Sequence, residues 1–333
     1  MAPVNHQIRL AAHPAGLPEP TDWELTTEPV PEPEPGQFVV GITYLSVDPA
    51  MLTWINGTSA ISTVPVGAVM EAAAVGRVTA TRHPGFAVGD HVAGAFGIQE
   101  YARSDGTGVT RLDPLLAPLA TYLSVLGVTG LTAYFGLLEV GRPASGETVV
   151  VSGAAGAVGS VAGQLARIKG CRAVGIAGGP DKCRWLTEDL GFTAAIDYKA
   201  EDLTRALGQH APDGVDVFVD NVGGDVLDAV LGRLARGARI VLSGGVSQYH
   251  TDHPRGPARY LSLIGARASM TGFITPDHAA RYPEARAELA GWLSDGRLIA
   301  REDLRDGGVR AFPAALNTLF AGQNTGKLLL AVP

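Results

Sequence analysis

The chain has 333 residues, of which 46% are hydrophobic and 18% charged, a globular composition long enough for about two domains. Its formal net charge of −7 argues against a nucleic-acid-binding surface, because such a surface needs clustered Lys and Arg. No apolar run reaches the roughly 18–20 residues that span a bilayer, and the N-terminus lacks a signal-peptide pattern, so we expect no membrane partner.

The cysteine content is low. Cys171 and Cys183 are the two cysteines of the sequence, too few for a disulfide framework or a four-cysteine zinc site. We expect both to be reduced thiols of a cytoplasmic protein.

Residues 1–127 have the pattern of a compact β-rich unit. Short apolar runs, such as Phe38–Leu45 and Gly89–Ala95, are bounded by Pro, Gly and Asp. The segment Pro29–Gly36 is too rich in proline for a helix or a central strand, and we interpret it as an extended surface connector.

From about Gly130 the pattern changes to alternating strands and helices. The expected strands are Glu147–Ser152, Arg172–Ala177, Ala194–Asp197, Val215–Val219 and Arg239–Ser243. The expected helices between them include Val158–Lys169, Asp181–Leu190 and Val226–Leu234. This alternation predicts an α/β fold with a doubly wound parallel sheet.

After about Ala258 a mixed stretch leads into a predicted helix, Pro283–Leu293, and a C-terminal strand in "GKLLLAVP". A final strand after helices suggests that the chain returns to its N-terminal β-rich part. We therefore predict one domain of residues 1–127 together with 300–333, and a second domain of residues 128–299.

The clearest chemical motif is "VVVSGAAGAVGS", Val149–Ser160. Ala154, Gly156 and Gly159 occupy the three positions of a dinucleotide-binding turn, with Ala157 and Val158 between the last two. The motif follows a strand, opens a helix and begins a βαβ run, so free N–H groups at the helix start can bind a pyrophosphate. A purely structural turn is the alternative.

The end of the second strand bears on the choice between NAD and NADP. An NAD site usually has a carboxylate there for the ribose 2′-hydroxyl, whereas this chain has Ala177-Gly178-Gly179. Lys182 lies just beyond and can contact a 2′-phosphate, which favours NADP(H). Lys182 can equally be a solvated helix residue, and Asp181 beside it is a counter-argument or an ordinary cap.

Several motifs together carry a family resemblance over nearly the whole chain. They are "YLSVDP", "HPGFAVGDHV", "AAGAVGS", "GCRAVGIAGGPDKCRWL", "AAIDYKAEDL", "DNVGGDVLDAVL", "VSQYH" and "REDLRDGGVRAFPAALNTLFAGQNTGK". The chain resembles the zinc-independent medium-chain dehydrogenases/reductases of the leukotriene B4 12-hydroxydehydrogenase/prostaglandin reductase group. Bacterial members of the curcumin reductase and 2-alkenal reductase type are the most similar.

The resemblance implies a GroES-like β domain beside a Rossmann domain, NADP(H) as cofactor, and a homodimer. It places cofactor contacts at the turn Gly156–Gly159, Lys182, Tyr198, Asn221, Ser243, Gly244, Gly245, Val246, Ser247, Tyr249, Phe273, Ile274, Thr275 and Asn324. Asn221 follows a strand's carboxyl end, where ligands of such sheets bind, although it can also be a turn residue. Tyr198 can instead cap the edge of the core.

No zinc site is expected. The N-terminal domain has no cysteine and no Gly-His-Glu sequence, and we interpret His91 of "GDHV" as a structural turn residue. Without a Lewis acid, reduction of an activated alkene is favoured over alcohol oxidation. The expected reaction is conjugate reduction of an enone or enal, with hydride going to the β-carbon and a proton to the α-carbon.

The sequence offers more than one candidate for the proton donor. Tyr249 and Tyr260 are the candidate catalytic residues, with Tyr44 more distant. Several family members carry a Tyr eight residues before the Phe that matches Phe273, and this chain has Gly265 there. If a ribose hydroxyl or water supplies the proton, no single tyrosine is essential.

The family sequence "DPYMR" is "DPAML" here, so Ala50 and Leu52 replace a Tyr and an Arg, which suggests a roomier and less polar substrate pocket. The alternatives are an NADPH:quinone reductase, a pathway-specific tailoring ene-reductase, and a non-catalytic NADPH-binding protein.

Overall fold

The computed structural model describes residues 3–59, 62–251 and 253–333. The chain divides into two compact units, unit 1 of Met1–Leu123 with Glu302–Pro333 and unit 2 of Ser124–Arg301.

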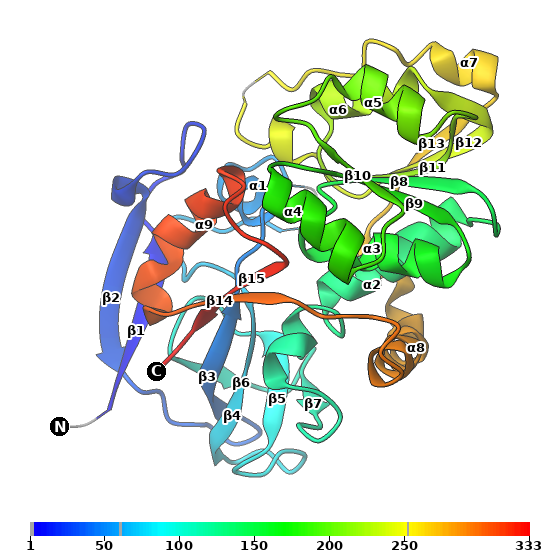
Figure 1. Ribbon diagram of the computed structural model, residues 1–333. Coiled ribbons are helices and arrows are strands. Elements are labelled where there is room, and N and C mark those ends of the chain that lie inside the picture. Colours follow the sequence, from blue (N-terminus) through cyan, green and yellow to red (C-terminus); the bar gives the residue numbers. More distant parts are fainter. Residues whose placement is uncertain (1–2, 60–61, 252) are drawn as a thin grey trace. The chain divides into compact units, whose positions relative to one another are not determined.

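Unit 1 is built on a mainly antiparallel sheet (Figure 1). Its strands, in spatial order within the described residues, are β14 (Glu302–Arg305), β15 (Lys327–Ala331), β3 (Phe38–Ser46), β4 (Ala73–Thr81), β5 (His91–Ala95) and β7 (Thr110–Leu112), with β6 (Tyr101–Ser104) also pairing with β3. Strand β15 pairs with β3, Leu330 opposite Leu45, so the C-terminal segment completes the N-terminal sheet.

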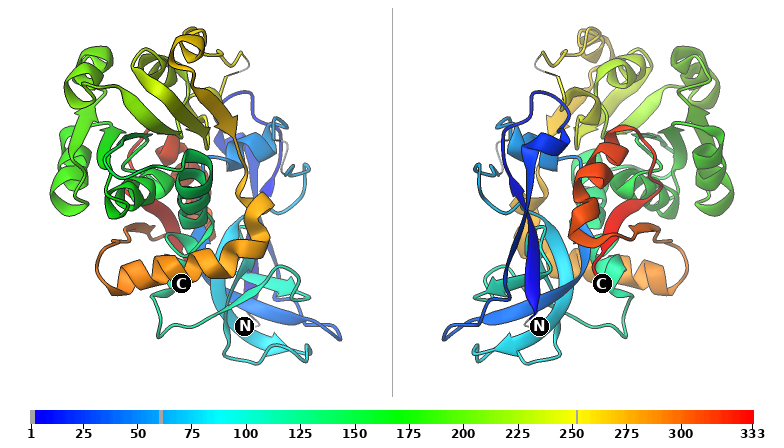
Figure 2. Two further views of the ribbon diagram at one scale, coloured as in Figure 1. Left: turned by 90° about the vertical axis from the view of Figure 1, so that its right-hand side faces the viewer. Right: turned by 90° about the vertical axis from the view of Figure 1, so that its left-hand side faces the viewer.

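Outside this sheet, β1 (Val4–Leu10) and β2 (Trp23–Pro29) form an antiparallel pair, drawn as a long twisted ribbon in Figure 2. The helices of unit 1 are α1 (Met51–Ile55) and α9 (Phe312–Phe320). Large side chains such as Phe38, Met51 and Phe312 are fully buried in its core.

Unit 2 holds the parallel sheet that the sequence predicts (Figure 1). Its strands, in spatial order within the described residues, are β10 (Ala194–Asp197), β9 (Arg172–Ala177), β8 (Thr148–Ser152), β11 (Val215–Asp220), β12 (Leu234–Leu242) and β13 (Ser269–Gly272). Every neighbouring pair is parallel. The order reverses between β8 and β11, and ligands of open α/β sheets bind at such a switch point.

Helices cover both faces of this sheet, as Figure 1 shows. They are α2 (Val128–Phe135), α3 (Ala157–Ile168), α4 (Pro180–Arg184), α5 (Leu203–His210), α6 (Gly224–Leu231), α7 (Ser262–Ala266) and α8 (Tyr282–Ser294). On the face covered by α5 and α6, buried residues such as Val150, Phe218 and Ile240 alternate with residues that point to the other face.

Three features differ from the sequence prediction. Strand β13 was not predicted, because its short and mostly exposed sequence has no apolar run. The predicted helix Val226–Leu234 ends at Leu231, and Leu234 already pairs with Val215. The predicted helix Asp181–Leu190 consists of α4 followed by a π-helical turn, Trp185–Asp189.

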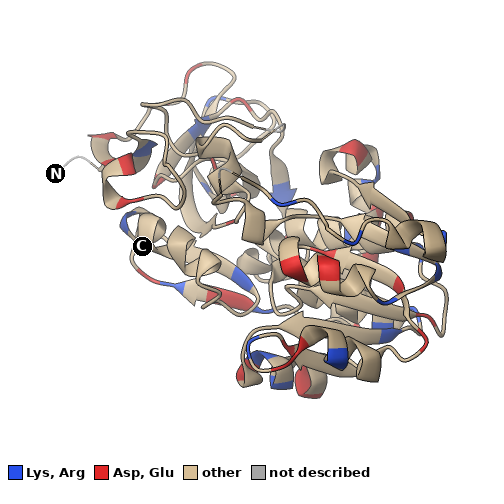
Figure 3. Ribbon diagram, turned by 90° about the horizontal axis from the view of Figure 1, so that it is seen from above, with Lys and Arg blue, Asp and Glu red and all other residues tan. Residues whose placement is uncertain are grey.

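Among the described helices, none combines the length and hydropathy that crossing a bilayer requires. Figure 3 shows Lys and Arg interspersed with Asp and Glu along the ribbon.

Candidate functional site

Almost all of the predicted cofactor residues follow the carboxyl ends of the parallel strands of unit 2. The loops after β8, β9, β10, β11, β12 and β13 begin at Gly153, Gly178, Tyr198, Asn221, Ser243 and Phe273 respectively. Because parallel strands in register end at the same edge, this edge collects segments that are far apart in the sequence. We call it the carboxyl edge.

The turn after β8 starts with a left-handed glycine. Gly153 has φ +57°, a conformation that glycine adopts without the steric cost of a Cβ. Ala154, which the sequence placed at the first position of the motif, is fully buried, and its N–H donates to the carbonyl of Ile176 at 3.0 Å. Gly153, which was not singled out from the sequence, therefore makes the turn, while Ala154 packs beneath it.

Gly156 and Gly159 set the start of α3. Gly156 is the N-cap residue, and the helix begins at Ala157. A Cβ on Gly159 would lie 2.4 Å from the carbonyl oxygen of Gly153 and 2.8 Å from the Cα of Ala154, so only glycine permits this close approach. The first N–H groups of the helix, including those of Ala157 and Val158, have no intrahelical partner and can bind an anion.

A buried hydrogen-bond network joins β8 and β11 at the switch point. The Ser152 hydroxyl donates to Asp220 Oδ1 at 2.7 Å and accepts from the backbone N–H of Asn221 at 2.8 Å. The Asn221 side chain donates to the Ser152 carbonyl at 2.8 Å. Asp220 also accepts from the N–H groups of Val222 and Gly223. Both the backbone N–H and the side-chain amide of Asn221 are thus held by Ser152.

Burial raises the pKa of the Asp220 carboxyl, against the lowering effect of its hydrogen bonds from Ser152, Gly223 and Val222. Sequence reasoning named Asn221 but missed Asp220 and Ser152. An aspartate that ends an apolar strand, "VDVFVD", is the signal that could have indicated Asp220.

The segment Ser243–Tyr249 is held against the loop after β11. The N–H groups of Ser243 and Gly244 donate to the Asp220 carbonyl at 2.8 and 3.1 Å. The Ser247 hydroxyl donates to the Val222 carbonyl at 2.6 Å. Val246 donates in the same way, through its N–H, to the Asn221 carbonyl at 3.1 Å.

The Tyr249 side chain folds back over this segment. Its hydroxyl accepts a hydrogen bond from the Gly245 N–H at 3.0 Å. This hydrogen bond attaches Tyr249 to the same cluster as Asn221.

Phe273–Thr275 follows β13. The Phe273 ring lies 2.8 Å from the position that a Cβ on Gly136 would occupy, so this glycine of the π-helical turn Gly136–Gly141 makes room for the ring. The hydroxyls of Thr275 and Thr132 are 2.6 Å apart. Ile274, which lies between Phe273 and Thr275 in the sequence, is 40% exposed. Helix α2 thus supports this part of the carboxyl edge.

Near the end of β9 lie Lys182, predicted for a 2′-phosphate, and Tyr198, predicted near the adenosine end of the cofactor. Lys182 is half-buried in α4, whose N-cap residue is Gly179. Tyr198 is exposed, and its ring lies beside Gly178. The two residues therefore flank the same strand end.

Two predicted residues lie elsewhere. Tyr260 is 55% exposed and precedes α7, and its neighbour Arg259 lies against Gly232, just beyond α6. Since α6 starts at the carboxyl edge, its far end lies at the opposite edge, and Tyr260 does not join Tyr249. Asn324 belongs to unit 1, where its side chain donates to the Gly326 carbonyl at 2.9 Å.

The substitutions in "DPAML" also lie in unit 1. Ala50 is the half-buried N-cap residue of α1, whereas Leu52 is fully buried in the core of that unit. Only Ala50 of the two therefore has surface that a substrate could meet.

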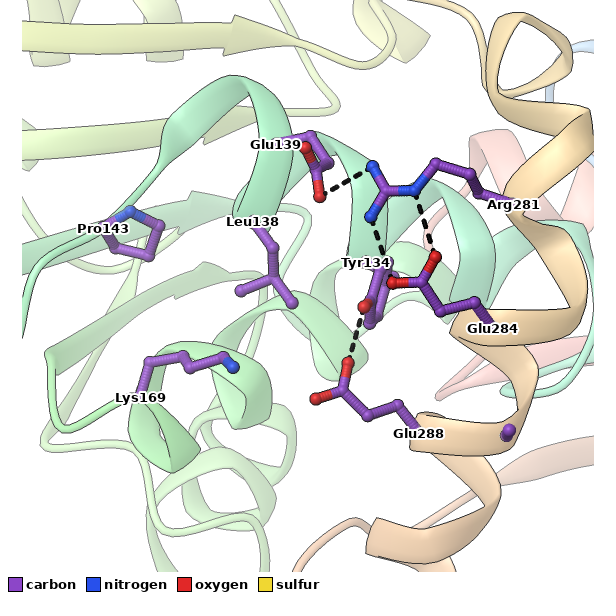
Figure 4. Close-up of a pocket in the computed structure, with 9 residues that line it drawn as sticks. Tyr134, Leu138, Glu139, Pro143, Lys169, Arg281, Glu284 and Glu288 are labelled. Atoms are coloured by element: carbon purple, nitrogen blue, oxygen red, sulfur yellow. Dashed lines mark hydrogen bonds and ion pairs between the residues drawn. The ribbon is translucent and has the colours of Figure 1, made fainter.

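A hollow in unit 2 lies apart from the carboxyl edge (Figure 4). It has a volume of about 720 Å³ and is lined by Tyr134, Leu138, Glu139, Pro143, Lys169, Arg281, Glu284, Ala287 and Glu288. Its polar groups pair with one another, since Tyr134 donates to Glu288 and Arg281 bonds to both Glu139 and Glu284. Lys169 follows the last residue of α3, so this hollow lies at the end of that helix opposite the glycine turn.

The described residues contain no cluster of three or more His, Cys, Asp or Glu side chains suited to a metal ion. His91 begins β5 and pairs with Arg77 and Leu112 in the ladder. Cys171 and Cys183 are free, and burial raises the pKa of each thiol to about 11.

Known proteins match both halves of the chain. Residues 6–112 match a family described as the N-terminal domain of oxidoreductase, and residues 157–291 match one described as zinc-binding dehydrogenase. YfmJ of Bacillus subtilis is 43% identical, covering 100% of this chain and 99% of that protein. The NADPH-dependent curcumin reductase of Escherichia coli is 39% identical over 98% of this chain and 97% of its own.

A solved structure agrees with the fold. CurA from Vibrio vulnificus in complex with NADPH superposes with a TM-score of 0.93 at 39% identity, covering 98% of this chain and 99% of that one. Mouse prostaglandin reductase 1 is 37% identical over 96% of this chain and 97% of its own. The chain therefore belongs to the zinc-independent reductases of the medium-chain dehydrogenase/reductase family.

Proposed function

We propose that this protein is an NADPH-dependent reductase of carbon–carbon double bonds conjugated to a carbonyl. The observation that carries the proposal is the carboxyl edge, with a glycine turn and helix start suited to a pyrophosphate. Full-length relatives named NADPH-dependent curcumin reductase, 2-alkenal reductase and (+)-pulegone reductase support the substrate class.

The residues present fit this cofactor. The space kept open by Gly159 lets backbone approach a pyrophosphate, and the first N–H groups of α3 donate to it. Lys182 is the proposed contact of the 2′-phosphate and Tyr198 of the adenosine end. The proposed contacts of the nicotinamide end are Asn221, Ser243–Tyr249 and Phe273–Thr275. Asn324 is proposed as a contact from unit 1. When bound, NADPH supplies the hydride for the β-carbon.

The protein's own task is to align the substrate and stabilise the negative charge that develops on its carbonyl oxygen. Tyr249 is the proposed proton donor to the α-carbon, because its hydroxyl accepts from the Gly245 N–H and so belongs to the cluster proposed for the nicotinamide end. Tyr260 is no longer favoured for this role, since it lies away from the carboxyl edge.

A substrate panel tests the function. We expect NADPH oxidation, followed at 340 nm, with simple enals and enones, and a saturated carbonyl compound as product. NADPH that binds without being consumed by any of them would support a non-catalytic binding protein. Faster turnover of quinones than of every enone would support the quinone reductase alternative. Solved quinone oxidoreductases share the fold at about 20% identity, and this similarity does not indicate the substrate of this protein.

We further infer that the protein is a homodimer of the cytoplasm. Within the described residues, strand β13 is at the edge of its sheet. In helix α7, just before it, Ile264 is 74% exposed, and Leu261, at the start of that helix, is 60% exposed. Apolar surface beside an unpaired strand edge suits a second copy of the chain. The free cysteines are consistent with a reducing compartment.

Light scattering after size-exclusion chromatography tests the dimer. Ile264→Glu is expected to give monomers, whereas Leu115→Glu, at a 95% exposed position of unit 1, leaves the dimer unchanged. A monomeric wild-type protein would contradict this inference.

A further inference from the structure

The loop after β10 places a second lysine at the end of β9. The Cε of Lys199 and the Cε1 of the Tyr198 ring each lie 2.9 Å from the position that a Cβ on Gly178 would occupy. The side chain missing at Gly178 is thus replaced by two side chains from the neighbouring strand's loop. Lys182 approaches the same strand end from α4, three residues beyond Gly179, the N-cap of that helix.

The carboxylate nearest to this strand end is engaged with backbone. Asp197 Oδ1 accepts from the Gly179 N–H at 2.8 Å and from the Lys199 N–H at 3.0 Å. It therefore ties the ends of β9 and β10 together. A carboxylate that binds a ribose diol instead presents its oxygens to the ligand.

The acidic groups described around Lys199 are engaged elsewhere. Asp181 pairs with Arg184, and Glu201 accepts from the Asp197 N–H. Lys199 is exposed, and none of the ion pairs among residues 3–59, 62–251 and 253–333 involves its ammonium group.

We propose that Lys199 acts with Lys182 as a two-lysine site for the 2′-phosphate of NADPH, and that Lys199 thereby helps to set the preference for NADPH over NADH. This inference rests on the proposed function. A phosphate monoester carries a charge of about −1.5 to −2 at pH 7, so one lysine leaves it incompletely neutralised. Lysines on both sides of Gly178 supply the second charge, and the Tyr198 ring borders the same space.

The test separates the 2′-phosphate from the rest of the cofactor. Adenosine 2′,5′-bisphosphate and adenosine 5′-monophosphate are titrated as competitors of NADPH against wild type, Lys199→Ala and Lys199→Arg. We expect Lys199→Ala to weaken binding of the bisphosphate roughly 5- to 10-fold, because an exposed charge-assisted contact is lost. Binding of the monophosphate should weaken less than about twofold. Lys199→Arg should restore most of the affinity. Lys169→Ala is the matched control, since Lys169 lies over Trp292 beyond the last turn of α3.

The outcomes are distinguishable. Equal losses for both nucleotides, or no loss for either, would remove Lys199 from the phosphate site while leaving the reductase assignment intact. A wild-type protein that binds neither NADPH nor the bisphosphate would overturn the proposed function itself.

Discussion

Replacing Gly159 with alanine tests the structural basis of cofactor binding. The new Cβ would lie 2.4 Å from the Gly153 carbonyl oxygen and 2.8 Å from the Ala154 Cα. Both contacts are with backbone, so the start of α3 must move away from the turn after β8. That movement displaces the N–H groups proposed to bind the pyrophosphate.

The magnitude follows from two opposing effects. Overpacking costs roughly 1–3 kcal/mol, and replacing a helical glycine with alanine returns about 0.5–1 kcal/mol. We therefore expect a net loss of about 1–2 kcal/mol in the free energy of unfolding. Loss of one charge-assisted hydrogen bond, about 1.5–3 kcal/mol, weakens NADPH binding roughly 10- to 100-fold.

The assay is a fluorescence titration of NADPH, with urea unfolding measured on the same samples. Gly163→Ala and Gly208→Ala are the matched controls, since both glycines also lie in helices. A Cβ on Gly163 would meet the Phe192 ring at 1.8 Å, whereas one on Gly208 would meet nothing within 4 Å. Gly163→Ala should lose stability but keep its NADPH affinity, and Gly208→Ala should lose neither. Unchanged NADPH binding by Gly159→Ala, or equal weakening by Gly163→Ala, would refute the reasoning.

Three further substitutions have defined outcomes. Ser152→Ala removes a hydrogen-bond donor to the buried carboxyl group of Asp220. Burial already raises the pKa of this carboxyl group above its unfolded value. Its contribution to folding stability therefore falls as the pH rises through its folded pKa. The variant should therefore lose about 1–3 kcal/mol at pH 7 and less near pH 4 in urea unfolding, and a pH-independent loss would contradict this. Lys327 is fully buried with its ammonium 2.6 Å from Asp48, so Lys327→Met should cost about 3–5 kcal/mol, and adding Asp48→Asn should recover part of it. Tyr249→Phe should lower kcat at least about tenfold with little change in NADPH affinity, whereas unchanged kcat would point to a ribose hydroxyl or water as proton source.

The parallel sheet was predictable because its first five strands are apolar, β-branched runs separated by helix patterns. Aligned parallel strands bring their carboxyl ends together, so Asn221 could be expected at the cofactor edge from its place after a strand, whereas Ser243 was expected there from the family resemblance. Strand β13 could not be found, because an edge strand with exposed side chains lacks that apolar pattern.

Other parts of the site depend on register and backbone conformation. The Ser152–Asp220 hydrogen bond joins residues 68 apart in the sequence, and it exists because β8 and β11 are neighbours in a particular register. Gly153 carries the left-handed turn, while Ala154 is buried, a distinction that the motif spacing alone does not contain. The sequence likewise gives no sign that Lys199 is a site residue, because its approach to Gly178 depends on the conformation of the loop after β10.

The most direct test of the account follows the hydride itself. The purified protein is given a simple enone and NADPH deuterated at the transferable C4 position, and the product is analysed by nuclear magnetic resonance. We expect a saturated ketone with one deuterium on its β-carbon. Deuterium on the carbonyl carbon of an alcohol, or no transfer to any conjugated alkene, would contradict it.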